Sequence, residues 1–419
     1  MWRSVRREFR GRSKTVNRRD AKKNPFRISP RLCASAVNKP EMHNLPYWRL
    51  SGFYFFYFAF VGAMAPFWGL YLKSLEFDAF QIGILMSLLQ VMRIFAPNIW
   101  GWVSDRSGKR VAIVQIAVGL SLASFVAVFF GTSFAWMFVA MSLMSFFWSA
   151  SLPLVEATTL SHLGEKTSKY GRIRLWGSVG FIVVVIGLGF LFDFVAIRWL
   201  LWAVFAIVAA LLLFSRHIPE AEVLAHHTDH LPIWHIIRRP EVLAFIGGGI
   251  LMAAAHGAYY TFYSIYLVDH GYAKSSVGLL WSIGVVCEIG IFLWMPRLLK
   301  RFSLRQVLLA SFALAVLRFL MIGWGVGLVV VIVIAQLLHA ATFGAYHSAA
   351  VQMVHRFFKG RHQAQGQALY NSLSFGAGGT LGGLYSGLTW ETLGPEITFT
   401  IAAACALVGL GLVAWKLRL

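Results

Sequence analysis

The sequence predicts an all-α membrane protein with twelve transmembrane helices, on three observations. First, 58% of the 419 residues are hydrophobic and 13% are charged, whereas soluble proteins carry about a quarter charged residues. Second, the apolar residues form blocks as long as the roughly 20 residues that a spanning helix needs. Third, basic residues gather in every second connection between these blocks, as they do in helical membrane proteins.

Twelve blocks have the required length, and one of them is unusually polar. They cover residues 47–72, 80–103, 111–131, 134–161, 173–193, 196–215, 242–268, 277–296, 306–325, 327–353, 364–388 and 397–415. The segment 364–388 contains "GQALYNSLSFGAGGTLGGLYSG" and is rich in glycine. Small residues are common where membrane helices pack closely, so we retain it as a span.

The basic residues predict the orientation of the chain. The connections after even-numbered spans carry Arg106, Lys109, Arg110, Lys166, Lys169, Arg172, Arg174, Arg216, Arg238, Arg239, Arg297, Lys300, Arg301, Arg305, Arg356, Lys359 and Arg361. The connections after odd-numbered spans carry only Lys73, Arg198 and Lys274. By the positive-inside rule, the even connections and both termini face the cytoplasm.

The charge pattern also divides the chain into four parts. Residues 1–46 form a basic extension, predicted to be disordered; residues 47–215 and 242–419 form two six-helix bundles; residues 216–241 form a cytoplasmic linker. The extension resembles a transit peptide or a basic surface arm. The alternative is that the native protein starts at Met42, just before the first span.

An internal repeat relates the two bundles. Shifted by 195 residues, Gly62–Ile94 aligns with Gly257–Ile289 without a gap, and ten of the 33 positions are identical. In this register Arg93 in span 2 corresponds to Glu288 in span 8. Two such bundles around a pseudo-two-fold axis place equivalent positions near a central cavity, as in transporters built from parallel repeats.

Local motifs add a family resemblance. "GWVSDRSGKR" follows span 2 and matches the loop signature of the major facilitator superfamily. "YGRIRLWGSVGF", "HGAYYTFYSIYL" and "QGQALYNSLSFGAGG" resemble the 3-phenylpropionic acid permease group, which is proton-linked and similar to lactose and nucleoside permeases. The resemblance implies the major facilitator fold and a gating role for Gly101, Asp105, Arg106, Gly108 and Arg110. Its polar positions match Arg93, Arg174, His256, Glu288, Arg318 and His339, and Glu156 stands where span 4 of the group can carry an acid.

The acid in span 8 is the predicted proton carrier. Ionisable residues inside a span indicate function by default, and lactose-type permeases couple protons through an acid, an arginine and a histidine on the corresponding helices. Glu288, Arg318 and His339 are that set here, with Glu156 as a further candidate. The alternative is that Glu288 forms a static, purely structural pair with Arg318. Glu156 and Arg174 form a second predicted pair, unless Arg174 only extends toward the interface.

The predicted substrate site combines cations with aromatic side chains. Arginine binds a carboxylate in a bidentate way, so Arg93 and Arg318, with Arg174, suit an anionic substrate. At helical spacing, span 7 presents His256, Tyr259 or Tyr260, and Tyr263, and span 10 presents Gln336, His339, Phe343 and Tyr346 or His347. These stripes line a cavity for an aromatic acid, or they serve only as contacts between helices.

These features predict a proton-coupled importer of a small aromatic carboxylate in a bacterial inner membrane. The alternatives are a proton symporter of sugars or nucleosides, a drug-type exporter and a non-transporting receptor. The sequence has no nucleophile–base set, metal-ligand motif or phosphate loop, so it predicts neither an enzyme nor a metal or cofactor site. Its basic residues lie in the extension and the connections, which argues against nucleic acid as a partner. A monomer suffices for this architecture.

Overall fold

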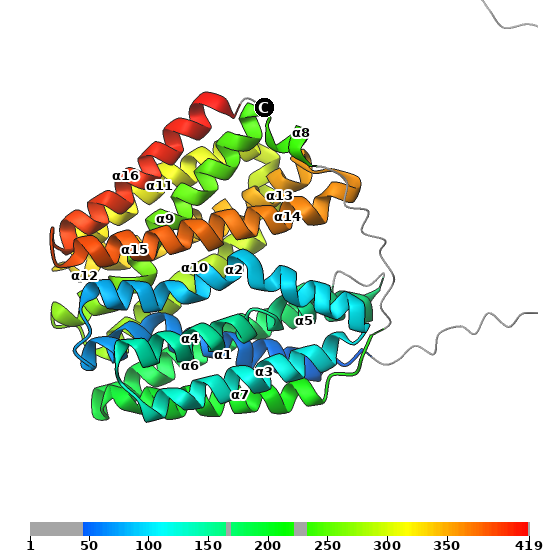
Figure 1. Ribbon diagram of the computed structural model, residues 1–419. Helices are drawn as coiled ribbons and strands as arrows, with labels where there is room; N and C mark the ends of the chain where they lie inside the picture. The colour runs from blue at the N-terminus through cyan, green and yellow to red at the C-terminus, as the bar shows by residue number, and fades with distance from the viewer. Residues whose placement is uncertain (1–44, 165–168, 222–232, 418–419) are drawn as a thin grey trace, which may run out of the picture. The chain divides into compact units, whose positions relative to one another are not determined.

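Long apolar segments fold as helices because lipid cannot satisfy backbone hydrogen bonds. The computed structural model describes residues 45–164, 169–221 and 233–417, and its helices form two bundles (Figure 1). The N-terminal bundle consists of α1 (Tyr47–Ser74), α2 (Ala79–Ser107), α3 (Arg110–Val126), α4 (Phe134–Trp148), α5 (Ser151–Leu163), α6 (Tyr170–Phe194) and α7 (Leu200–Arg216). The C-terminal bundle consists of α8 (Trp234–Ile237), α9 (Pro240–Asp269), α10 (Lys274–Arg301), α11 (Leu304–Gly325), α12 (Val329–His339), α13 (Tyr346–Phe357), α14 (Gln363–Tyr370), α15 (Gly379–Trp390) and α16 (Pro395–Lys416).

These helices make the twelve spans that the sequence predicts. Helices α4 and α5 form one continuous span, Phe134–Leu163. Helices α12 and α13 are joined by the π-helical turn Ala340–Ala345, and α14 and α15 by the π-helical segment Asn371–Gly378. Within the described residues, eleven helices are long and apolar enough to cross a membrane. The remaining span is Gln363–Trp390, the eleventh along the chain; it is the polar segment, and it lies against α2 and α9.

The span boundaries extend beyond the predicted ones, most clearly at the end of α2. The sequence predicts that this span ends at 103 and that Gly101–Arg110 is a loop, but α2 continues to Ser107. Gly108 ends the helix with φ 65°, a left-handed conformation that glycine adopts without strain. The prediction was wrong here because the boundary was drawn where the apolar residues end, whereas the helix continues through the polar residues Ser104–Ser107 as far as Gly108.

The extension lies almost wholly outside the described residues, and the linker lies partly outside them. The described chain from Leu45 onward forms one compact unit. Of the predicted extension 1–46, only residues 45 and 46 are described. Helix α7 ends at Arg216 and α9 begins at Pro240, but residues 222–232 of the linker are not described. The extent of the extension and of the linker therefore stays a prediction.

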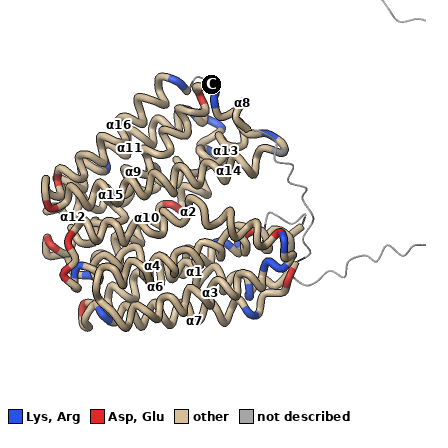
Figure 2. Tube along the Cα trace, in the orientation of Figure 1, with Lys and Arg blue, Asp and Glu red and all other residues tan. Residues whose placement is uncertain are grey.

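Charged residues gather at the two ends of the helices, and the middles are almost free of them (Figure 2). We call one end the Asp269 end; it carries most of the acidic side chains. We call the other the basic end; it carries Arg106, Lys169, Arg297 and Lys359 among others. This separation follows from the high free energy of placing a charge in hydrocarbon.

The two bundles meet through α1 with α9, α2 with α15, and α6 with α10. Glycines permit the close approach. A Cβ atom added at Gly83 would lie 2.7 Å from the carbonyl oxygen of Gly383, and one added at Gly278 would lie 2.5 Å from that of Val185. Larger side chains at these positions would push the bundles apart.

Polar contacts between the bundles occur at the Asp269 end. Lys73 at the end of α1 forms an ion pair with Asp269 at the end of α9. The carboxylate of Asp193 accepts hydrogen bonds from the backbone N–H groups of Lys274 and Ser275 at the start of α10. In the same way, Glu391 accepts from the N–H of Ala79 at the start of α2. Among the described residues, these are the side-chain hydrogen bonds and ion pairs that join the two bundles, so the bundles are closed at this end.

Candidate functional site

Arg318 is the centre of the polar cluster and lies halfway along α11 with no exposed surface. Its Nε donates a hydrogen bond to the carbonyl oxygen of Ala335 (3.0 Å). Its Nη1 lies 3.3 Å from Nε2 of His256 and 3.4 Å from the hydroxyl of Thr342. The guanidinium carbon is 4.3 Å from the centre of the Tyr259 ring, a cation–π contact. A buried charge requires such partners, and they come from α9, α12 and the π-helical turn.

His256 is held as a neutral hydrogen-bond acceptor by its two partners. Its Nδ1 lies 2.9 Å from the carbonyl oxygen of Met252, one turn earlier on α9, and must carry the hydrogen there. Its Nε2 then has a free lone pair, which accepts from Arg318. The ring therefore supports the guanidinium instead of adding a second positive charge.

Glu288 lies beside His339, with Oε2 and Nε2 3.8 Å apart. The carboxylate comes from α10 and the imidazole from the last residue of α12, and their side chains are 17% and 7% exposed. Gly344, in the π-helical turn, makes this approach possible, because a Cβ there would lie 3.1 Å from Cγ of Glu288. A small shift, or one bridging water, brings the two groups within proton-transfer distance.

Glu288 and Arg318, both described, form no ion pair with each other, so the structure does not contain the static pair that the sequence left as the alternative. Nε of Arg318 is directed toward Ala335, and Nη1 toward His256 and Thr342, while the buried Nη2 has no hydrogen-bond partner among the described residues. Arg93 and Glu288, equivalent in the repeat, form no ion pair with each other either.

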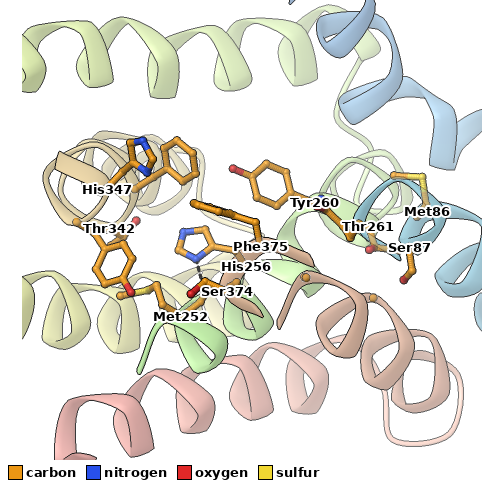
Figure 3. Close-up of a pocket in the computed structure, with 18 of the residues that line it drawn as sticks. Met86, Ser87, Met252, His256, Tyr260, Thr261, Thr342, His347, Ser374 and Phe375 are labelled. Carbon is orange, nitrogen blue, oxygen red and sulfur yellow. Dashed lines mark hydrogen bonds between the residues drawn. The ribbon is translucent and has the colours of Figure 1, made fainter. Parts of the chain in front are cut away.

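A cavity lies between α2 and the C-terminal bundle, next to His256 (Figure 3). Figure 3 shows His256, Tyr260 and Phe375 gathered at its centre, with the His256–Met252 hydrogen bond dashed. Its other lining residues include Met86, Ser87, Gln90, Thr342, Phe343, Tyr346, His347, Tyr370 and Ser374. Five of the lining side chains are Tyr or Phe, and the rest of the wall consists of methionines, small residues and a few hydroxyl, amide and imidazole groups, which is the usual make-up of a small-molecule site.

The aromatic stripes on spans 7 and 10 therefore divide between cavity and scaffold. Tyr259 and Tyr263 are fully buried, and the hydroxyl of Tyr259 donates to Gln336 (3.1 Å). They are not among the residues that line the cavity. Tyr260, one position along the helix, lines it instead. The sequence could not decide whether Tyr259 or Tyr260 faces the cavity, because residue spacing does not determine how a helix is rotated about its axis.

Two arginines of the N-terminal bundle are partly accessible. Arg93 is exposed, and its Nη1 donates a hydrogen bond to Oε1 of Gln90 (3.2 Å), a cavity residue. Nε of Arg174 lies 3.8 Å from Oε1 of Glu156, which is the pair rather than the extension toward the interface that the sequence left as the alternative. Its guanidinium also lies over the ring of Phe58, at 3.9 Å, and Tyr170 donates a hydrogen bond to Glu156.

The gating residues lie at the basic end, and none of them forms a side-chain hydrogen bond or an ion pair with a described residue of the C-terminal bundle. Arg106 lies over the ring of Trp102 (5.7 Å), and Arg110 donates a hydrogen bond to Ser161 (3.3 Å). Asp105 is exposed and forms no ion pair with a described residue. Gly101 and Gly108 leave open space around them.

Sequence reasoning missed the contribution of the π-helical segments. They place Thr342, Phe343, Ser374 and Phe375 on the cavity wall, and π-turns often occur at functional sites. The sequence signal was the clustering of small residues in "AATFGA" and "NSLSFGAG"; the second lies in the segment 364–388, which we read only as close packing.

The helical fold, the internal repeat and the central polar cluster define a membrane transporter of the major facilitator type, not an enzyme. The chain matches the MFS_1 like family over residues 47–401 and belongs to that family. It is 30% identical to the "Probable 3-phenylpropionic acid transporter" of Escherichia coli, over 83% of this chain and 92% of that protein. It is 26% identical to the "Maltose permease" of Geobacillus stearothermophilus, over 85% and 91% of the two chains.

Solved structures agree on the fold. The crystal structure of the nucleoside transporter NupG superposes with a TM-score of 0.78 at 20% identity, over 89% of this chain and 99% of that chain. The multi-pass membrane setting and a small-molecule substrate follow from the family.

Proposed function

We propose that this protein is a proton-coupled importer of a small aromatic carboxylate, of the 3-phenylpropionate kind, in a bacterial inner membrane. One observation carries the proposal: the acid–histidine pair Glu288–His339 lies next to the cluster around Arg318, which borders an aromatic cavity. The printed name of the Escherichia coli relative supports the same substrate class.

The roles of the side chains follow from their charge and surroundings. Glu288 takes up the proton, and His339 is its nearest exchange partner. Arg318, fixed by neutral partners, provides a permanent positive charge beside them. Arg93 and Arg174 are more accessible and bind the substrate carboxylate, because a guanidinium offers two parallel donors. Tyr260, Phe343 and Phe375 pack on the aromatic ring.

Transport then requires that the cavity be reached from each side in turn. The excess of basic residues assigns the basic end and both termini to the cytoplasm, so the closed Asp269 end faces outward. Rocking of the bundles opens that end and closes the basic end, where Asp105, Arg106 and Arg110 gain partners on the other bundle. A single chain contains every part of this cycle.

A symporter of sugars or nucleosides is the second candidate. The maltose and nucleoside relatives favour it, as do the hydroxyl and amide groups of Ser87, Gln90 and Ser374 on the cavity wall. A neutral substrate would have no use for two accessible arginines, which places this candidate behind the first. A drug-type exporter would move its substrate out of the cell. Accumulation inside intact cells, measured in the uptake assay below, distinguishes import from export.

Uptake by intact cells distinguishes these candidates. Cells expressing the chain are given labelled 3-phenylpropionate, maltose or uridine, with and without a protonophore. We expect accumulation of the aromatic acid that the protonophore abolishes, and none in cells with an empty vector. Accumulation of maltose or uridine without the aromatic acid would overturn the substrate, and accumulation that resists the protonophore would overturn the coupling.

A further inference from the structure

A surface groove at the basic end of α10 lies away from the central cavity and has no part in the proposed transport cycle. It is lined by Trp294, Arg297, Leu298, Lys300, Arg301 and Phe302, and its volume is about 280 Å³. We propose that it binds the headgroup of an anionic phospholipid from the surrounding membrane.

The groove carries three positive charges without internal compensation. Arg297, Lys300 and Arg301 recur at helical spacing and therefore share one face of α10. Within the described part of the chain, none of them lies within ion-pair distance of a carboxylate or makes a side-chain hydrogen bond. Arg305, a few residues further on, is different: it donates to the carbonyl oxygens of Leu417 (2.7 Å) and Ala414 (2.8 Å) at the end of α16.

The apolar surface next to these charges favours a lipid over a free anion. Leu293 is 75% exposed, Trp294 53% and Phe302 47%. Leu293 and Trp294 precede the first cation by one turn, at the level where a span leaves the hydrocarbon. Trp is typical of this interface. An acyl chain can lie along these side chains while the phosphate contacts the cations, whereas inorganic phosphate would gain nothing from them.

The equivalent position in the N-terminal bundle, at the end of α2, carries an acid beside its arginine. A shift of 195 residues takes Arg297, Lys300 and Arg301 onto Trp102, Asp105 and Arg106. There Arg106 lies over the Trp102 ring, and Asp105 contributes a negative charge one residue away. In α10 a lysine replaces that acid, so this position carries a net positive charge that an anion from outside the chain can balance. Basic pockets on the cytoplasmic side of spans are known to take anionic headgroups.

The test measures lipid binding to the purified full-length chain in a neutral detergent by native mass spectrometry. The protein is titrated with phosphatidylglycerol or with phosphatidylcholine. The groove variant R297Q/K300Q/R301Q is compared with R216Q/R238Q/R239Q, which removes the same charge from exposed positions at the basic end outside the groove. We expect the groove variant to bind phosphatidylglycerol at least about tenfold more weakly, since each basic residue near an anionic surface contributes roughly fivefold. The control and R297K/R301K should bind it normally.

Three results would overturn the proposal. One is an equal loss in the groove variant and the control, which would indicate a general charge effect. Another is equal binding of phosphatidylcholine and phosphatidylglycerol. The third is displacement of phosphatidylglycerol by an equimolar amount of inorganic phosphate, which would make the groove a site for small anions. Transport activity is not part of the readout, so failure here leaves the proposed function untouched.

Discussion

The polar contacts at the Asp269 end predict how the balance between the two conformations can be shifted. Three carboxylates, Asp193, Asp269 and Glu391, each reach across from one bundle to the other. Two of them bind the first backbone N–H groups of a helix, where the helix dipole favours a negative charge. The variant D193N/D269N/E391Q removes all three charges and leaves side chains of the same shape. It should favour the conformation that is open at this end.

The size of the effect follows from the kind of each contact. Lys73 and Asp269 are 46% and 42% exposed, and exposed ion pairs contribute about 0.2–1 kcal/mol. An acid at an exposed helix N-terminus contributes about 0.3–1 kcal/mol, and there are two. The total of roughly 1–3 kcal/mol corresponds to a change of about 5- to 150-fold in the ratio of the two conformations.

Accessibility of a single cysteine measures this ratio. Thr261 lines the cavity on α9 and is 6% exposed, so Thr261→Cys, with Cys33, Cys287 and Cys405 changed to serine, gives the reporter. Intact cells are treated with a membrane-impermeant maleimide, and the labelling rate should rise at least about fivefold in the triple variant.

A matched control removes three acids from the same end without touching the interface between the bundles. In E76Q/D78N/E396Q, Asp78 caps its own helix and Glu396 accepts from Tyr266 of its own bundle. Equal labelling rates in the two triple variants would refute the reasoning, because they would show that the contacts across the bundles do not hold this end closed.

Two further predictions concern the central cluster. Glu288→Gln should abolish accumulation of the substrate against its gradient yet permit counterflow, because the site stays intact while the proton carrier is lost; unimpaired accumulation would contradict the assignment. His256→Leu should lower the stability of the detergent-solubilised protein by roughly 1–3 kcal/mol, because Nη1 of Arg318 loses its buried acceptor. Thermal unfolding measures this loss, Tyr260→Phe serves as the control, and equal midpoints for the two variants would count against the role of His256.

The sequence located the spans because hydropathy reports length and depth, which are the properties that the bilayer selects. It also located the polar residues along their helices, and it offered Glu156 and Arg174 as a pair, with extension of Arg174 toward the interface as the alternative. It could not determine how each helix is rotated about its axis. Glu288 therefore faces His339 instead of Arg318, and Tyr260 instead of Tyr259 lines the cavity. These choices depend on contacts between helices that are distant in sequence.

The π-helical segments and the end of α2 escaped prediction for local reasons. A π-turn accommodates one extra residue among small neighbours, and nothing in "AATFGA" distinguishes it from an ordinary close-packed helix. The end of α2 depends on the positive φ of Gly108, whereas our boundary was drawn from hydropathy and fell four residues early.

The polar eleventh span has a consequence for how the protein is assembled in the cell. Gln363–Trp390 gains too little from contact with lipid to partition into the bilayer readily by itself. Its glycines instead meet backbone on both sides: Gly387 and Gly383 contact Gly83 of α2, and Gly382 contacts Gly257 of α9. Both partners are synthesised earlier, so the ribosome has already delivered them when this segment emerges. Its membrane insertion thus depends on the earlier folding of α2 and α9, between which it packs. Substitutions at its glycines should therefore lower the amount of protein in the cell, through degradation, before they affect activity.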